Sequence, residues 1–291
     1  MDITTYLISV YCLVDDWLKG QRIRQRGPQP QLSDSEVLTM ELVGEFLGID
    51  TDVGLFTYFR RHYGDWFPVL RQVDRTTFTR QAANLWVVKE RFWQHLTRLV
   101  PHDPLISIVD SFPLPVCRFA RAPRCRIFAG LAAYGYDEVA RQTYYGLRAH
   151  VRLCWPGVMV AATIAPANIH DTEAAEELLH EAQGWALGDR NYWKPNFREA
   201  LLDQELYLMA PYRSAKRQKF HYPHWLVEKR YRIETVFGQL VERFHAKKIW
   251  ARDAWHLTAR WWRKIISHLI AVLFCQQLGL SPLRFSELIT D

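Results

Sequence analysis

The spacing of apolar residues along the chain changes near position 100. Before that point, apolar residues recur every three or four positions, as in residues 3–17, which predicts amphipathic helices that pack against one another. Ser33 and Glu36 form a capping-box pattern, which predicts the start of another helix. We therefore expect residues 1–100 to form an all-helical domain that ends before Pro101.

Beyond this boundary the pattern becomes that of strands. Residues 105–110 form a mostly apolar run that ends in Asp110, and Pro113 and Pro115 predict that the strand does not continue past this aspartate. A carboxylate at the end of a buried strand is costly to desolvate without a cation or a partner. Asp110 is therefore a candidate site residue, although an Asx turn at a strand exit is the more ordinary use of such an aspartate.

The next apolar segments predict the rest of a sheet. Residues 144–153 and 158–166 alternate between apolar and polar positions on either side of a Pro-Gly turn, which predicts an antiparallel hairpin beside the Asp110 strand. Helices and short strands then alternate, and Asp189 ends one of these strands. A long amphipathic helix carries Glu234. This order predicts an α/β domain with a mixed sheet.

Three carboxylates are thus expected to converge, two from strand ends and one from a helix. The negative charges of three such carboxylates repel one another unless a hard cation neutralises them. Mg²⁺ and Mn²⁺ are hard cations that prefer oxygen ligands of this kind. Two ions about 3.5–4 Å apart can activate an attacking oxygen and stabilise a leaving oxygen in phosphoryl transfer. The pattern therefore predicts chemistry on a phosphodiester.

The distribution of charge also points to a polyanion. The formal net charge is +6, yet the stretch from Arg190 to Lys264 contains 17 Lys and Arg against 7 Asp and Glu, a local net of +10. This asymmetry is typical of a protein that binds nucleic acid. A solvated basic face that binds nothing specific is the alternative.

The cysteines and the apolar runs indicate the cellular location of the protein. Five cysteines are scattered without CxxC spacing, the opening helix lacks the basic start of an export signal, and no apolar run is long enough to span a membrane. We expect reduced thiols, a cytoplasmic location and no membrane partner.

The helical domain carries arginines among its short helices, at positions 60, 61, 71, 75 and 80. This arrangement is typical of a helix-turn-helix-like unit that reads DNA. Surface arginines are as common on helices that only pack or dimerise, so both interpretations stay open.

Five segments, taken in order, resemble one family. They are IVDSFPLPV around Asp110, YYGLRAHVRL with the strand after it, NIHD at 168–171, LGDRNY around Asp189, and KRYRIETVFGQL around Glu234. Together they resemble the bacterial insertion-sequence transposases of DDE type, whose catalytic core has the RNase H-like fold. The segment LSDSEVLTMELVGEFLGID also resembles the N-terminal half of one branch of these enzymes.

The resemblance implies a site and a reaction. Asp110, Asp189 and Glu234 would be the catalytic triad that binds two Mg²⁺ or Mn²⁺ ions. Water would attack a phosphodiester at the element end, and the freed 3′-hydroxyl would then attack target DNA in the same site. Both DNA partners would be double-stranded, and the protein would act as a homodimer at the bacterial nucleoid.

The resemblance also implies a division of the chain. Residues 1–100 would be a helical DNA-binding or dimerisation domain. Residues 101–291 would be the RNase H-like DDE catalytic domain, with the C-terminal helices included. Two other functions stay open: a metal-dependent nuclease of the same fold that does not join strands, and a non-catalytic DNA-binding protein descended from a transposase.

The chain departs from the Tyr-Arg-Glu-Lys signature of related transposases. Arg230 matches its Arg, but Val227 and Val241 stand where its Tyr and Lys would fall. Contacts credited to that Lys are therefore expected from Lys247 or Lys248. Arg230 lies four positions before Glu234, which is also the spacing of an ordinary helical ion pair.

Two loops rich in basic residues are expected to lie beside the site, at 118–126 and 213–219, and to contact phosphates. Trp185 and Trp193 are candidates for stacking on an unpaired base. His170 is expected to begin a helix rather than to act on the metal. The residues expected to contact DNA are Arg118, Arg121, Arg124, Arg126, Arg190, Arg213, Lys216, Arg217, Lys219, Arg230, Lys247 and Lys248.

Overall fold

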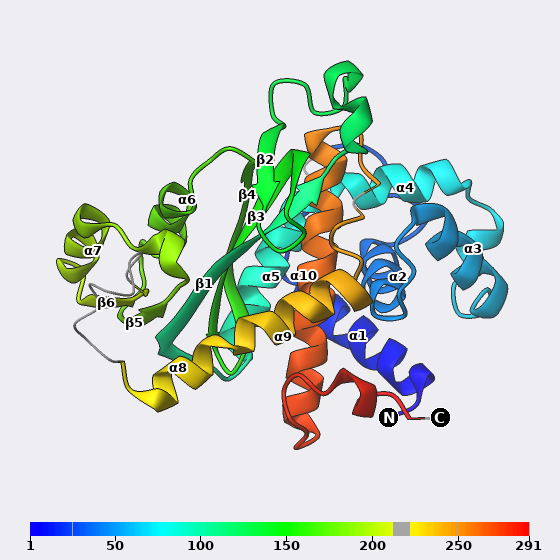
Figure 1. The fold of residues 1–291 in the computed structure, drawn as a ribbon. Coiled ribbons are helices and arrows are strands. Elements are labelled where there is room, and N and C mark those ends of the chain that lie inside the picture. The colour runs from blue at the N-terminus through cyan, green and yellow to red at the C-terminus, as the bar shows by residue number, and fades with distance from the viewer. Residues whose placement is uncertain (25, 212–221, 249, 291) are drawn as a thin grey trace. The chain divides into compact units, whose positions relative to one another are not determined.

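Figure 1 shows the computed structural model of the chain, which describes residues 1–24, 26–211, 222–248 and 250–290. The chain folds into two compact units. The first, the helical unit, consists of Met1–Val100 together with Leu240–Asp291, and the second, the sheet unit, consists of Pro101–Gln239.

This division differs from the predicted domains at the C-terminal end. The predicted boundary after residue 100 coincides with the start of the second unit, but the C-terminal helices were expected to belong to that unit and instead group with the first. The reason is the burial of α10 (Ala254–Gln277), in which nearly every residue from Leu257 to Cys275 is buried. A helix that is buried on all sides requires other helices around it, and α2, α4 and α5 provide that surface.

The remaining helices of this unit follow the predicted order with small shifts. The expected capping box is confirmed, since Ser33 and Glu36 each accept a hydrogen bond from the other's backbone N–H. Residues 75–99 form two helices that meet at Leu85. The bounds are α1 Ile3–Leu18, α2 Asp34–Phe46, α3 Asp52–His62, α4 Arg75–Asn84 and α5 Trp86–Leu99, with short 3-10 turns at Pro68–Arg71 and Phe285–Glu287.

The second unit is a mixed sheet with helices, as predicted. Its main path runs β2-β3-β1-β5-β6, and β4 pairs with β3 beyond the end of β2. The hairpin β3–β4 and its pairing with β1 are antiparallel, whereas β5 and β6 run parallel to β1. The strands are β1 Asp103–Pro115, β2 Ala133–Asp137, β3 Gln142–Trp155, β4 Val158–Pro166, β5 Gly184–Leu187 and β6 Leu206–Met209.

The helices of this unit match the expected positions, with one interruption. The long helix expected around Glu234 is divided at Tyr231 into α8 (His224–Arg230) and α9 (Arg232–Gly238), and a π-helical turn follows at Gln239–Arg243. The others are α6 Asp171–Leu178 and α7 Pro195–Leu202, with 3-10 turns at Phe119–Arg124 and Arg190–Tyr192. Within the described ranges, every helix is too short or too polar to cross a membrane.

The expectation that the strand ends at Asp110 is wrong. β1 continues through Pro113 and Pro115, which pair with β3. Proline is tolerated where its missing N–H would not face a neighbouring strand. The N–H of Val116 donates to β3, so the proline positions face the other side, where β5 pairs with β1 only as far as Ile108.

Candidate active site

The parallel pairing of β1 and β5 brings Asp110 and Asp189 together. Ile108 pairs with Leu187 in this register, and each aspartate lies two residues further along its own strand direction. Neighbouring strands lie about 4.8 Å apart, so the two carboxylates leave the sheet side by side. Asp110 is thus in the middle of β1 and yet just past the end of its parallel neighbour.

Local hydrogen bonds orient both carboxylates. The Oδ1 atom of Asp110 accepts from the N–H of Ser111 at 2.7 Å. Asp189 caps the 3-10 turn that follows it, since its Oδ1 accepts from the N–H of Asn191 at 2.8 Å and its Oδ2 accepts from the Asn191 amide at 3.0 Å. Both side chains therefore have a defined orientation before any ligand binds.

The surroundings make ionisation of these carboxylates unfavourable. Burial raises the pKa of Asp110 to about 7, and the charges of Asp189 and Asp171 act in the same direction, while the Ser111 N–H and Arg230 oppose them. Burial is also the main cause that raises the pKa of Asp189, and Asp171 again adds to it. A site that penalises adjacent negative charges in this way gains from a bound cation.

Asp171 is a third carboxylate of this region that the sequence did not single out. Its Oδ1 accepts from the Ser111 hydroxyl at 2.8 Å and from Arg148 at 3.4 Å, and the His150 ring lies 3.6 Å away. Burial lowers the pKa of His150 to about 4, so its ring is neutral at pH 7. Arg148 is thus the cation that offsets Asp171, which leaves Asp110 and Asp189 as the more available pair.

The signal for Asp171 was present in the NIHD segment, where an aspartate opens α6. His170 caps this helix, because its Nδ1 accepts from the N–H of Thr172 at 3.2 Å. This confirms the prediction that His170 begins a helix. Strand alternation alone could not show that β3 would supply an arginine to the aspartate.

The helices α8 and α9 lie against the same strands. The Lys229 ammonium lies 3.6 Å from the ring centroid of Trp155 at the end of β3, and Arg232 lies 4.8 Å from it. Phe237 in α9 contacts Phe112 in β1, with ring centroids 4.9 Å apart. Alternation along a strand places Phe112 on the same face as the residue two positions before it, so α9 covers the face of β1 to which Asp110 belongs.

Glu234 is not part of the carboxylate cluster in this structure. Its side chain is exposed on α9, one helical turn before Phe237. Across the part of the chain that the structure describes, no three Asp, Glu, His or Cys side chains are grouped closely enough to hold one metal ion. Asp110 and Asp189 are therefore together, with Arg230 as a nearby cation, while Glu234 is on the neighbouring helix.

The oxygen donors of the two aspartates suit a hard divalent cation. Carboxylate oxygens are the preferred ligands of Mg²⁺ and Mn²⁺, and a cation would remove the repulsion that raises both pKa values. The residues present thus fit such an ion, with two ligands in place.

The basic residues predicted to contact DNA are distributed over several segments. Arg118, Arg121, Arg124 and Arg126 are all exposed in the connection between β1 and β2, and Arg190 is exposed directly after Asp189. Lys247 and Lys248 belong to the helical unit. Four predicted contacts lie outside the described residues, namely Arg213, Lys216, Arg217 and Lys219.

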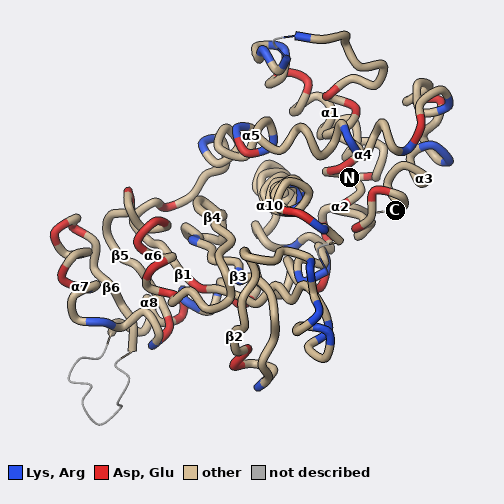
Figure 2. The backbone as a smooth tube through the Cα atoms, turned by 90° about the horizontal axis from the view of Figure 1, so that it is seen from above, with Lys and Arg blue, Asp and Glu red and all other residues tan. Residues whose placement is uncertain are grey.

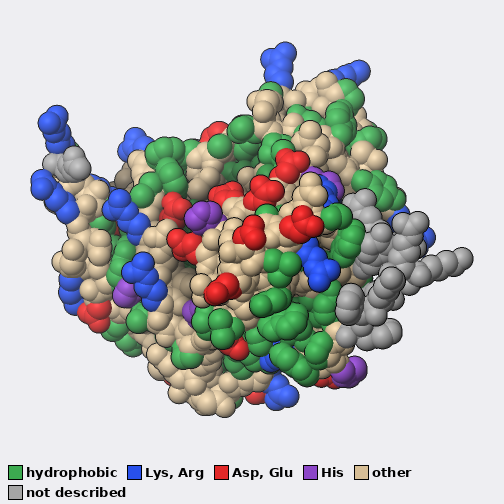
Figure 3. Space-filling view, turned by 90° about the vertical axis from the view of Figure 1, so that its left-hand side faces the viewer, with side chains coloured by type: hydrophobic (Ala, Val, Ile, Leu, Met, Phe, Trp, Pro, Cys, Tyr) green, Lys and Arg blue, Asp and Glu red, His purple; other side chains and the backbone are tan. Residues whose placement is uncertain are grey.

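Acidic side chains gather on the side of the sheet unit that carries α6 and α7. Figure 3 views the side of Figure 1 that carries α6 and α7, and Asp and Glu side chains gather across its middle. Glu173, Glu176 and Glu177 of α6 are exposed.

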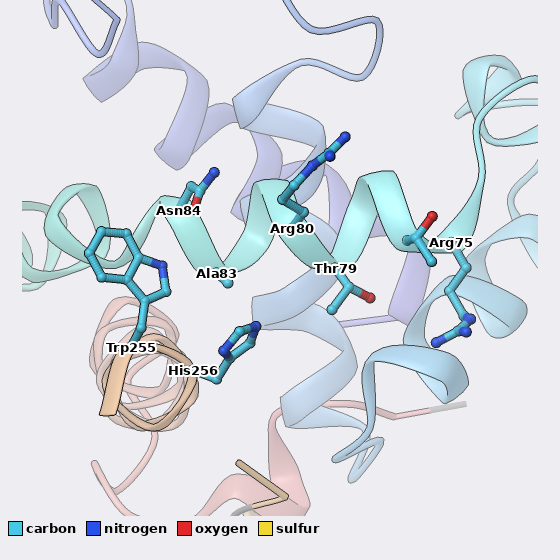
Figure 4. Close-up of a pocket in the computed structure, with 8 residues that line it drawn as sticks. Arg75, Thr79, Arg80, Ala83, Asn84, Trp255 and His256 are labelled. Atoms are coloured by element: carbon cyan, nitrogen blue, oxygen red, sulfur yellow. The ribbon is translucent and has the colours of Figure 1, made fainter. Parts of the chain in front are cut away.

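The helical unit contains a separate basic hollow of about 220 Å³. One wall is a face of α4 and the other is the start of α10, where Trp255 and His256 lie (Figure 4). Arg75 and Arg80 contribute the positive charge, and the Thr79 and His256 side chains extend into the space between the helices.

A fold with two aspartates at adjacent strands of a mixed sheet defines the class of protein. A family model described as a transposase DDE domain matches residues 102–249, about half of the chain and all of the predicted triad. The chain belongs to this family and is a DDE-type transposase. No curated protein and no solved structure matches the chain.

The raised pKa of Asp110 predicts a pH-dependent effect on stability. The folded-state pKa of about 7 exceeds the ordinary value of 3.8, so folding favours the protonated form, and stability is lost as the pH rises from about 4 through 7. We expect Asp110→Asn, which cannot ionise, to be more stable than the wild type at pH 8 by about 1–4 kcal/mol without metal. The difference should shrink toward pH 4.

Urea unfolding in EDTA at several pH values measures this difference. Asp203→Asn is the matched control, because Asp203 is exposed at the end of α7 and its neutralisation should leave the pH profile unchanged. A stability gain from Asp110→Asn that is the same at pH 5 and pH 8 would contradict the assignment.

Proposed function

We propose that this transposase cleaves DNA at the ends of a bacterial insertion sequence and joins the freed 3′-hydroxyl ends to target DNA. The observation that carries the proposal is the β1–β5 register, which places Asp110 beside Asp189 inside the region that matches the transposase family. Both reactions transfer a phosphoryl group between oxygens, so one site can serve them in turn.

Asp110, Asp189 and Glu234 would hold two Mg²⁺ or Mn²⁺ ions. When bound, such ions polarise the phosphate and lower the pKa of the attacking water or hydroxyl. Asp110 and Asp189 would contribute a pre-oriented pair of carboxylates, because their hydrogen bonds to Ser111 and Asn191 already direct them.

The proposal that Glu234 completes this set is supported by the position of α9. This helix packs on the Asp110 face of β1 through Phe237 and Phe112. Arg230, which lowers the pKa of both aspartates, would hold Glu234 or a phosphate oxygen.

An RNase H-like core is proposed on the strand order. An antiparallel hairpin on one side of β1 and two parallel strands on the other agree with this fold. The open edge of β1 beyond Ile108 would leave room for a DNA strand next to the aspartates.

DNA contacts would come from both units. Arg118, Arg121, Arg124, Arg126 and Arg190 are exposed in the sheet unit and would bind phosphates. Lys247 and Lys248 would take the role of the signature lysine, and the basic loop at 213–219 is proposed to add to them.

The helical unit is proposed to bind DNA or to mediate dimerisation. Its basic hollow, which Arg75 and Arg80 of α4 line, supports a DNA contact (Figure 4). A homodimer would hold the two ends of an element together, and the protein would act at the nucleoid in the bacterial cytoplasm.

A cleavage and joining assay tests the proposal. The substrate is labelled duplex DNA that carries the inverted repeats flanking the gene, with a supercoiled plasmid as target and Mg²⁺ or Mn²⁺ present. We expect nicked or cleaved ends first and labelled plasmid afterwards. Cleavage without joined product would instead establish a nuclease, and DNA binding without cleavage a non-catalytic derivative.

A further inference from the structure

Aromatic rings cluster on the surface at one edge of the sheet. Phe119, in the connection between β1 and β2, is 54% exposed, and Tyr134 of β2 is 49% exposed. Their ring centroids lie 6.2 Å apart, and Tyr134 also contacts Tyr145, its directly opposite partner on β3, at 5.1 Å. A group of large rings in mutual contact and open to solvent is typical of a binding surface.

The same surface is strongly basic. The segment 111–136 contains four arginines and no aspartate or glutamate. Arg118, Arg121, Arg124 and Arg126 are all exposed, and no ion pair involves them in the described ranges of the chain. Figure 2 shows Lys and Arg, in blue, along the loop beside β2 and β3.

A hollow adjoins the rings. It has a volume of about 460 Å³ and lies between residues 115–119 and residues 142–144. Phe119 belongs both to its wall and to the ring cluster, and Arg118 adds a guanidinium to it. The surface therefore combines flat aromatic faces, positive charge and a concavity.

These three features suit unpaired nucleotides better than duplex DNA. Bases in a duplex already stack on one another, so they offer no free face to a tyrosine ring. Unpaired bases stack on aromatic side chains while arginines hold their phosphates. An acidic peptide would be attracted by the charge, but it would leave the stacking surface unused.

We propose that the aromatic edge, defined as Phe119, Tyr134 and Tyr145 with the arginines of residues 118–126, binds unpaired nucleotides of DNA. This inference rests on the proposed function, because cleavage at an element end frees strands that can separate from their complements. Trp185 and Trp193, the residues suggested by the sequence, are less suited, because Trp185 lies on β5 near the opposite edge of the sheet and Trp193 packs on the hydrophobic core.

The opposite edge of the sheet supplies a matched control. Tyr207 of β6 is 53% exposed and its ring contacts Trp185 at 5.6 Å. It thus has the same exposure and ring pairing as Tyr134. The segment before it, residues 198–206, carries one arginine, Arg198, against Glu199, Asp203 and Glu205, so it should attract DNA less than the aromatic edge does.

The test measures binding by the full chain carrying Asp110→Asn, in EDTA, by fluorescence anisotropy. The probes are a labelled oligothymidine of roughly 20 nucleotides and a duplex of the same length. We expect Tyr134→Ala to raise the Kd for oligothymidine about fivefold to 150-fold, because stacking on an aromatic ring stabilises a base by about 1–3 kcal/mol. The Kd for the duplex should change far less.

Three comparisons decide the outcome. Tyr134→Trp should retain oligothymidine binding, Phe119→Ala should weaken it, and Tyr207→Ala should weaken it far less than Tyr134→Ala. Equal weakening of single-strand and duplex binding by Tyr134→Ala, or a larger loss from Tyr207→Ala, would overturn the proposal. Since the assay needs neither metal nor cleavage, a protein that binds oligothymidine but never cleaves DNA would contradict the proposed function alone.

Discussion

Replacing Asp110 by asparagine is expected to slow metal-dependent DNA cleavage by about a thousandfold or more. Polarisation of a phosphoryl oxygen by a bound metal contributes several kcal/mol, and each 1.36 kcal/mol is a factor of ten in rate. Asparagine keeps the shape of the side chain but removes the charge that holds the cation. Asp189→Asn should have a similar effect, because the two carboxylates leave adjacent strands together.

The same assay decides the role of Glu234. We expect Glu234→Gln to lose cleavage, although its carboxylate is exposed and outside the cluster. Glu228→Gln is the matched control, since Glu228 is an exposed glutamate on α8 and its loss should leave the rate unchanged. Wild-type cleavage by Glu234→Gln would require a different third ligand, and wild-type cleavage by Asp110→Asn would remove the whole site.

Cleavage products should be followed on single turnover with duplex ends that carry the inverted repeats. Binding of each variant to the same duplex, measured without metal, separates loss of chemistry from loss of DNA affinity. We expect Asp110→Asn to bind the duplex at least as tightly as the wild type, because that aspartate would repel a phosphate when no cation is bound.

Replacing Arg263 by methionine is expected to destabilise the helical unit by about 3–5 kcal/mol. Arg263 is fully buried in α10. Its guanidinium donates to Glu45 of α2, to Asp52 at 2.8 Å and to the carbonyl oxygen of Asp50 at 2.9 Å. Methionine fills a similar volume, but it leaves Glu45 and Asp52 with one cation each, Lys264 and Arg260, in place of two.

The loss should be visible in thermal unfolding, with a decrease in Tm of roughly 6–20 °C. Arg284→Met is the matched control, because Arg284 pairs with Glu287 on the surface and such pairs contribute less than about 1 kcal/mol. An Arg263→Met variant as stable as this control would show that the buried cluster does not hold the unit together.

A second buried pair in the same unit provides an independent comparison. Lys89 of α5 contacts Glu41 of α2 at 2.6 Å, and both are buried. Lys89→Met alone should destabilise the protein more than the double variant Lys89→Met/Glu41→Met. The single variant leaves the buried Glu41 carboxylate without its lysine, whereas the double variant removes both charges of the pair.

Much of the fold followed from local pattern. The capping box at Ser33, the β3–β4 hairpin and the helix that starts at Asp171 were all predicted where the structure has them. Each of these features depends on residues close together in the sequence, such as a capping side chain and the N–H groups from which it accepts hydrogen bonds. The pairing of Asp110 with Asp189 was also anticipated, through the order of strands.

Two local interpretations failed for a common reason. Pro113 and Pro115 do not end β1, because the strand edge at which these prolines have no N–H to donate faces no neighbouring strand. Asp171 was not recognised as part of the site, because its partners Arg148 and Ser111 come from other strands. In both cases the deciding neighbour is distant in the sequence.

By itself the sequence determined the types and order of the elements, the two aspartates at adjacent strands and the family resemblance. Only the tertiary structure decided that α10 completes the helical unit, that Arg148 offsets Asp171, and that exposed rings gather beside the arginines of residues 118–126. The spacing of apolar residues shows which face of a helix or strand is apolar, but it does not show which distant element will cover that face. Burial, ion pairing and shifted pKa values all depend on that covering element, so they arise only when the chain is folded.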